Sequence, residues 1–212
     1  MAGMPPDQDP FPASDFDDWA ATYDHSVSID QFPFYGYRQV IARIVALAQA
    51  RPGLAVLDLG TGTGNLALPF AHAGCSLWCC DFSEPMLARA RAKLPDAHFA
   101  LHDLRTPLPA GFDRPFDRIV SAYVFHHFVL EEKVRILGAL LPNLAPGGVF
   151  ILGDVAFRDR AALEQVKASQ GDAWEDEFYW LADETLPALE ACGLRVQYQQ
   201  VSVCAGVFRI ER

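Results

Sequence analysis

The strongest chemical signal in the sequence is a glycine-rich segment that directly follows a short apolar run containing Asp58. Gly60, Gly62 and Gly64 stand at alternate positions of this segment. Glycines permit the positive φ angles of a tight turn and let the backbone approach a ligand without an intervening Cβ. The third glycine of a dinucleotide-binding G-x-G-x-x-G loop would fall at Asn65. Taken alone, the segment therefore predicts either a ligand-binding loop or merely a tight turn between a strand and a helix.

Two further carboxylates follow the next two predicted strands. Asp81 comes directly after the apolar run 76–80, and Asp103 follows the run 97–101. An acidic residue at the first of these positions can accept hydrogen bonds from both hydroxyls of a ribose. The second could accept a hydrogen bond from an adenine amino group. Either aspartate alone could be a helix cap or a solvated loop residue, but three such features at successive strand ends predict a nucleoside site.

A histidine pair, His126 and His127, follows the fourth apolar run. Histidine gains and loses a proton near neutral pH, so either residue could act as a general base. The alternative is structural, with one ring packed beneath the following helix and the other bonded to the backbone. We predict that the pair has a catalytic or substrate-contacting role.

Aromatic residues gather in two other segments, and an acidic run, 175–177, lies within the second. They could form the apolar walls of a substrate cavity, or they could simply be core. The acidic run predicts a solvated face or, if it lines a cavity, an amine or cationic substrate. The aromatic residues are Phe32, Phe34, Tyr35, Tyr37, Trp174, Phe178, Tyr179 and Trp180.

Strand and helix patterns alternate through most of the chain, which predicts a doubly wound, mostly parallel sheet with helices on both faces. Two final strands joined by a few residues must pair as an antiparallel hairpin, giving seven strands in all. Pro69 falls inside a predicted helix, which should therefore start late or bend there. The strands are expected at 54–59, 76–80, 97–101, 116–122, 149–155, 194–201 and 205–210, and the helices at 15–23, 35–50, 65–73, 83–94, 131–144, 160–170 and 183–191.

Length and composition limit the classes of function. The 212 residues, 51% of them hydrophobic, fit one domain over 15–212, with a helical cap at 15–50, a core at 51–212 and a flexible tail at 1–14. The net charge of −10 disfavours a nucleic-acid partner. No apolar stretch approaches the roughly 20 residues of a membrane span, and no signal peptide is evident, so a cytoplasmic location is expected. The five cysteines form no C-x-x-C pair, so reduced thiols and no metal site are expected.

The segment 56–65 resembles motif I of the class I S-adenosylmethionine-dependent methyltransferases. Asp81 matches the ribose-binding acid of that family, Asp103 its adenine-contacting acid, and 116–121 its fourth-strand motif. The likeness extends over roughly residues 35–212, and 16–24 resembles the N-terminal cap of short bacterial members that act on small molecules. The resemblance implies a Rossmann-like fold and S-adenosylmethionine as the cofactor.

The same resemblance implies positions for individual residues. Gly60 and Gly62 would face the methionine part of the cofactor, and Ser121 would lie near its sulfonium. Phe82 and Met86 would flank the adenine and ribose. Tyr23 would lie over the cofactor, and Asp58 would order the loop or hold a water. The complete set is Tyr23, Asp58, Gly60, Gly62, Gly64, Asp81, Phe82, Met86, Asp103, Leu104 and Ser121.

The predicted activity is in-line methyl transfer to a small molecule. A base is needed only if the acceptor loses a proton, and His126 and His127 are the candidates. One alternative is an NAD(P)-dependent oxidoreductase, which the glycine spacing disfavours. Another is a cofactor-binding protein without turnover. The sequence leaves the substrate, the acceptor atom and the oligomeric state open.

Overall fold

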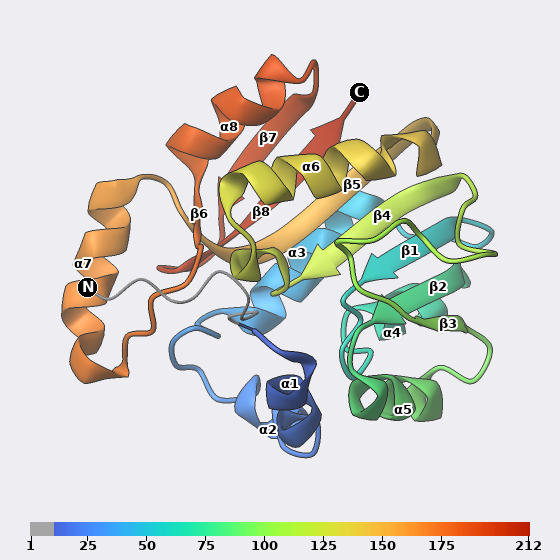
Figure 1. The fold of residues 1–212 in the computed structure, drawn as a ribbon, viewed down its shortest axis with the longest axis horizontal. Coiled ribbons are helices and arrows are strands. Elements are labelled where there is room, and N and C mark those ends of the chain that lie inside the picture. Colours follow the sequence, from blue (N-terminus) through green and yellow to red (C-terminus); the bar gives the residue numbers. More distant parts are fainter. Residues whose placement is uncertain (1–10) are drawn as a thin grey trace.

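A computed structural model describes residues 11–212 as one sheet with helices packed against it (Figure 1). Residues 1–10, most of the predicted tail, lie outside the described residues. The helices are α1 Ala13–Trp19, α2 Tyr23–Ser26, α3 Tyr37–Ala48, α4 Ala67–His72, α5 Glu84–Lys93, α6 Leu130–Leu140, α7 Arg160–Gln170 and α8 Ala182–Ala191. The strands are β1 Ala55–Leu59, β2 Ser76–Asp81, β3 His98–Leu101, β4 Phe116–Ala122, β5 Leu144–Phe157, β6 Trp180–Leu181, β7 Arg195–Gln200 and β8 Ala205–Glu211.

The sheet has the order β3-β2-β1-β4-β5-β8-β7. The first five strands of this path are parallel, and β8 and β7 form the antiparallel hairpin. The predicted fold class is thus confirmed. One correction concerns the strand count, because β6 pairs in parallel with the end of β5 and brings the total to eight. β6 has only two residues, too short a run to produce an alternating pattern.

Each face of the sheet packs against its own helices. One core contains Val56 of β1 and Val120 of β4 with Ile44 of α3 and Phe70 of α4. The second core lies on the opposite face, where alternate residues of the same strands pack against α6 and α8. The buried β1 and β4 therefore lie at the centre of the molecule, and their carboxyl ends are held in place from both faces.

Two of the predicted local features differ in the structure, and a third, the late start of the helix that contains Pro69, is confirmed. The predicted helix 15–23 is divided into α1 and α2, and the Thr22 hydroxyl donates to the Trp19 carbonyl at the break (3.4 Å). α4 starts late, at Ala67, which leaves Pro69 in the first turn where it removes no helical hydrogen bond. The turn expected at 146–148 is instead an irregularity within β5, whose pairing with β4 shifts register there.

In the part of the chain that the structure covers, no helix has the length and apolar character needed to cross a membrane.

Candidate functional site

A cavity of about 610 Å³ lies at the carboxyl ends of β1 and β4. The strand order reverses between these two strands, and open α/β sheets bind ligands at such a point. Helices α1 and α2 lie below these strand ends in Figure 1, and Phe16, Trp19 and Tyr23 from this cap line the cavity. The volume is within the range of small-molecule sites, roughly 300–1,000 Å³.

The glycine loop supplies the backbone wall of the cavity. Gly60 has φ +65°, and a Cβ at this position would lie 2.3 Å from Cγ2 of Val124. Gly62 has φ +52°, and among the described residues, its own chain neighbours aside, no atom lies within 4 Å of the position a Cβ would take. Both residues line the cavity. Gly60 therefore allows the loop to approach the segment that follows β4, whereas Gly62 leaves open space for a ligand against the backbone.

The carboxylate of Asp81 lies beside this loop and also lines the cavity. Its Oδ2 accepts a hydrogen bond from the backbone N–H of Gly62 (2.8 Å), and Oδ1 accepts one from Ser83 (2.9 Å). Burial raises the pKa of Asp81 to about 6, against the lowering effect of these hydrogen bonds. The side chain is thus held in one orientation, and each oxygen retains a lone pair for a ligand hydroxyl.

Three residues of the predicted cofactor set lie behind the loop and do not line the cavity. The buried Asp58 accepts from the Thr61 hydroxyl, and burial raises the pKa of Asp58 to about 7. The Ser121 hydroxyl donates to the carbonyl of Leu59 (2.7 Å). Gly64 faces α5, where a Cβ would lie 3.2 Å from Leu94. In the structure, these three residues hold the strand ends and the loop together.

The rest of the predicted set lines the cavity: Tyr23, Phe82, Met86, Asp103 and Leu104. The Asp103 carboxylate forms an ion pair with Arg105 (2.8 Å). Burial opposes the charge, but Arg105 outweighs burial and lowers the pKa of Asp103. Asp103 thus lies at the expected edge of the cavity as a paired carboxylate.

Asp24, which the sequence did not single out, joins the cap to the glycine loop. Its Oδ1 accepts from the Thr63 hydroxyl (2.5 Å) and the Asn65 amide (3.0 Å), and its Oδ2 pairs with Lys93 (2.7 Å). A second connection runs from the Ser83 hydroxyl to Asp17 of α1 (2.6 Å). The contacts span about forty to seventy positions, so no local pattern could reveal them.

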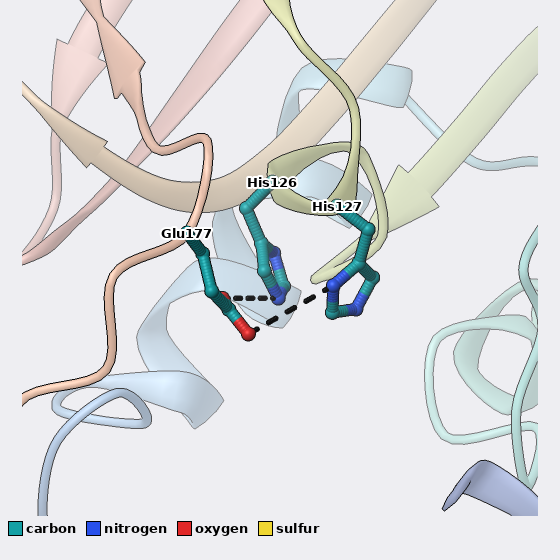
Figure 2. A group of neighbouring side chains, drawn as sticks. All are labelled: His126, His127 and Glu177. Carbon is teal, nitrogen blue, oxygen red and sulfur yellow. Dashed lines mark ion pairs between the residues drawn. The ribbon is translucent and has the colours of Figure 1, made fainter. Parts of the chain in front are cut away.

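A second polar group occupies another part of the same cavity. His126 and His127 belong to a 3-10 helix after β4, and Glu177 comes from the segment before β6 (Figure 2). The Nδ1 atom of His126 lies 2.5 Å from Oδ1 of Asp154, and its Nε2 lies 3.5 Å from Oε2 of Glu177. The Nδ1 atom of His127 lies 3.9 Å from Oε1 of Glu177. The predicted histidine pair is therefore brought together with two carboxylates.

The charges of this group depend on burial and on one another. Burial disfavours the charged imidazole of His126, but Asp154 outweighs it and raises the pKa. Burial, followed by the charge of His126 and of Lys133, lowers the pKa of His127 to about 2. Burial raises the pKa of Glu177 and lowers that of Lys133 to about 8. The two adjacent histidines thus favour different protonation states.

Asp154 was also missing from the predicted set, although a signal was present. It is a lone carboxylate in the apolar strand β5 and is 2% exposed. A buried charge is costly unless it is paired and hydrogen-bonded. Its Oδ2 accepts from the backbone N–H of His126 (3.0 Å) and from Nε1 of Trp180 (2.9 Å).

The two aromatic segments meet, as Phe32 stacks on Trp174 with ring centroids 4.9 Å apart. Phe32, Phe34, Phe178 and Tyr179 line the cavity. Trp180 instead belongs to the core beside Asp154. Glu175 and Glu177 also line the cavity. These two glutamates thus belong to the wall of the cavity and not simply to a solvent-exposed face.

The chain matches a family model described as a methyltransferase domain over residues 56–148. An uncharacterized methyltransferase of Geobacillus sp. (strain WCH70) is 36% identical over 175 residues, which cover 80% of this chain and 78% of the relative. Another, from Anoxybacillus flavithermus, is 35% identical over 189 residues, or 82% of this chain and 84% of the relative.

Solved structures share the fold. The DhpI-SAM-HEP complex aligns with a TM-score of 0.74 and 22% identity over 94% of this chain and 95% of that chain. Magnesium protoporphyrin IX methyltransferase (ChlM) from Synechocystis PCC 6803 with bound SAH aligns with a TM-score of 0.69 and 21% identity, over 94% and 99% of the two chains. The chain belongs to the class I S-adenosylmethionine-dependent methyltransferases.

Proposed function

We propose that this enzyme transfers the methyl group of S-adenosylmethionine to a small molecule that enters the cavity beside the cofactor. The observation that carries the proposal is that one continuous cavity is lined by the glycine loop, by Asp81 and by the histidine pair. The cofactor supplies an activated methyl group on a sulfonium, and the chain supplies alignment and an enclosed site. Correct alignment alone can contribute on the order of 7–11 kcal/mol.

The cofactor end fits a nucleoside with an amino-acid tail. We assign the binding of the ribose hydroxyls to Asp81, which lines the cavity. The adenine would lie against Phe82 and Met86 and near residues 103–104, which line the cavity as well. The space beside Gly62 supports a ligand lying directly on the loop backbone. Tyr23 would cover the cofactor from the cap. Asp58, Gly64 and Ser121 would act from behind the loop, by keeping it in shape.

The acceptor is assigned to the part of the cavity lined by His126 and His127. Asp154 engages Nδ1 of His126, so Nε2 is the nitrogen directed toward Glu177. An acceptor that loses a proton needs a nearby group to take it, and imidazole nitrogens commonly do so. We therefore retain a catalytic role for the histidine pair, with His126 as the proton acceptor and His127 as a substrate contact, because burial leaves His127 a weak base.

The character of the cavity favours a particular acceptor class. Rings from the cap and from 178–179 provide apolar walls, and Glu132, Glu175 and Glu177 add carboxylates. Aromatic faces and carboxylates both attract cations. We infer that the cavity binds an amine, another cation with apolar groups or a neutral apolar molecule in preference to an acid. The net charge of −10 likewise supports a small molecule over a nucleic acid, and the cytoplasm is the proposed location.

The test is an acceptor screen in which formation of S-adenosylhomocysteine is measured with matched amines, alcohols, thiols and acids. Turnover with amines or neutral apolar acceptors would support the proposal. Turnover with carboxylic acids alone would overturn the proposed acceptor class. A protein that binds the cofactor but methylates nothing in a broad screen would favour the catalytically silent alternative. The oxidoreductase alternative is set aside, since the chain belongs to a methyltransferase family.

A further inference from the structure

Three side chains with metal-binding atoms converge in the cavity (Figure 2). His126, His127 and Glu177 each offer one such atom, and these atoms all lie within 4.8 Å of one another. The closest measured pairs are 3.5 Å, from Nε2 of His126 to Glu177, and 3.9 Å, from Nδ1 of His127 to Glu177. Zinc–ligand bonds of about 2.1 Å in tetrahedral geometry place ligand atoms roughly 3.4 Å apart. Small side-chain rotations would thus bring all three atoms to bonding distance of one ion.

The surroundings of His126 are those of a metal ligand. Its Nδ1 is engaged by Asp154, which is itself fixed by hydrogen bonds from Trp180 and from the backbone of His126. A carboxylate on the far nitrogen is the usual arrangement behind a metal-bound histidine, because it sets the tautomer and the ring orientation. Nε2 is therefore presented toward Glu177, where it can hold either a proton or a metal ion.

His127 supplies an independent observation. Its Nδ1 is buried and has no hydrogen-bond partner among the described residues. Buried polar atoms are nearly always paired, so an orphan nitrogen that faces a carboxylate requires an explanation. Its position beside Glu177 is the one that a shared ion would satisfy. Without an ion, the nitrogen is too far from the carboxylate oxygen, at 3.9 Å, for a good hydrogen bond.

We propose that Nε2 of His126, Nδ1 of His127 and the carboxylate of Glu177 bind one divalent transition-metal ion. Two imidazoles and one carboxylate match Zn²⁺ best, and three protein ligands leave a fourth position open. All three residues line the cavity, so this position would be accessible to a small molecule. The sequence shows no such site because Glu177 is separated from the histidines by some fifty residues.

The charge balance also favours a cation. With both imidazoles neutral, Asp154 and Glu177 carry two negative charges, and the neighbouring Lys133 carries one positive charge. The Lys133 ammonium donates to the carbonyl of Phe178 and lies 4.3 Å from the centroid of the Trp180 ring. The group then has a net charge of −1, which attracts a cation. A metal ion and a proton on Nε2 of His126 are alternatives, because both use the same lone pair.

The metal site does not depend on the proposed acceptor chemistry. If both proposals hold, the ion would lie at the acceptor end and favour the ionised form of an acceptor bound to it, in place of the histidine base. If the chain binds metal but methylates nothing, the site stands and the proposed function fails. Measurement of S-adenosylhomocysteine binding on the same samples separates these outcomes.

The test is titration of chelator-treated, dialysed full-length protein with Zn²⁺ by calorimetry and with Co²⁺ by visible absorption. We expect one ion per chain and the intense d–d bands of a four-coordinate Co²⁺ site without thiolate charge-transfer bands. His127→Gln and Glu177→Gln should each weaken Zn²⁺ binding at least about 100-fold. Asp154→Asn, behind the ligand, should weaken it by about 10–100-fold.

The matched controls are His72→Gln and Glu131→Gln, which remove an exposed histidine and an exposed glutamate elsewhere. Both should leave metal binding unchanged. Retained S-adenosylhomocysteine binding would establish that the His127 and Glu177 variants are folded. Absence of Zn²⁺ and Co²⁺ binding by the folded parent protein would overturn the proposal. So would binding that persists in both ligand variants, because the ion would then lie elsewhere, for example on cysteine thiols.

Discussion

The two ends of the cavity are built in different ways. The proposed cofactor end is built from the backbone of 58–65 together with Asp81, Phe82 and Met86, and hydrogen bonds such as the one from Gly62 to Asp81 hold it. The proposed acceptor end consists of large or ionisable side chains from the cap, the histidine pair and the segment around Glu177. On this assignment, backbone geometry contributes most to the cofactor end, whereas side chains define the acceptor end. Substitutions at one end should therefore leave the other end working.

The largest expected effect follows from adding one methyl group at the cofactor end. In Gly60→Ala the new Cβ would lie 2.3 Å from Val124, at a φ of +65°. Crowding of this kind costs about 1–3 kcal/mol, and the positive φ adds roughly 1 kcal/mol. The loop must shift, so affinity for S-adenosylhomocysteine should fall on the order of 100-fold. Calorimetric titration measures this change.

The matched control for that substitution is Gly53→Ala. Gly53 has φ +86°, and its added Cβ would meet no atom within 4 Å in the part of the chain that the structure describes, apart from its chain neighbours. The variant carries the same kind of backbone penalty outside the cavity, so it should lose about 1 kcal/mol of stability and keep its affinity. Equal losses of affinity in the two variants would mean that general destabilisation, and not the geometry of the loop, explains the Gly60 result.

A smaller effect is expected at the connection between cap and loop. Asp24→Asn removes the ion pair with Lys93 and weakens the acceptor that serves Thr63 and Asn65. The pair is partly exposed, so its own contribution is about 0.2–1 kcal/mol. Affinity for S-adenosylhomocysteine should fall several-fold, with a faster dissociation rate because the cap is held less firmly. Unchanged binding and dissociation in stopped-flow measurements would show that the cap contributes nothing to retention of the ligand.

The buried carboxyls give the cofactor end a response to pH. Burial raises the pKa of Asp58 to about 7 and that of Asp81 to about 6. Unfolded aspartate has a pKa of about 3.9, so the folded state binds these protons more tightly. Their contribution to the free energy of unfolding is therefore full at low pH and is lost as pH rises from about 4 to 7.

Urea unfolding of the ligand-free protein and of Asp58→Asn, measured in parallel over this range, tests that account. The stability of the variant relative to the parent should rise with pH, since the variant has no carboxyl at this position to ionise. A difference between the two proteins that stays constant with pH would show that Asp58 keeps an ordinary pKa in the folded state.

The smallest effect on affinity for S-adenosylhomocysteine is expected for a substitution at the proposed acceptor end. Glu177→Gln alters the acceptor end, where the carboxylate faces both histidines, and leaves the glycine loop untouched. Its affinity for S-adenosylhomocysteine should stay within about threefold of the parent value. A loss as large as that of Gly60→Ala would mean that the two ends of the cavity are not independent.

The sequence was most informative where a feature is local. The positive φ angles of Gly60 and Gly62 arise within a few residues. Asp81 was recognisable because it ends one apolar strand, β2. The alternating strands and helices predicted the layers and the hairpin for the same reason. Pro69 likewise predicted the late start of α4.

Features that depend on tertiary contacts were not predicted. The segment with Glu177 is held beside the histidines by the pairing of β6 with β5 and by a hydrogen bond from the N–H of Phe178 to the carbonyl of His126 (3.0 Å). A strand of two residues leaves no periodic signal. Asp24 meets the glycine loop across about forty positions of sequence. Gly64 and Ser121 are of types that often contact a cofactor. In the structure, however, Gly64 faces α5, and the Ser121 hydroxyl donates to the carbonyl of Leu59. Residue types and their spacing therefore predicted at which end of the strands the cavity lies, whereas tertiary packing determines which side chains face it.

The most direct test of the central claim is calorimetric titration of the purified protein with S-adenosylmethionine and S-adenosylhomocysteine, with Asp81→Ala and Asp96→Ala in parallel. Asp81 faces the cavity, whereas Asp96 is an exposed turn residue. We expect micromolar binding by the parent and by Asp96→Ala, and a loss of at least about 30-fold in Asp81→Ala, corresponding to roughly 2 kcal/mol. Absence of binding by the folded parent protein, or full affinity in Asp81→Ala, would contradict it.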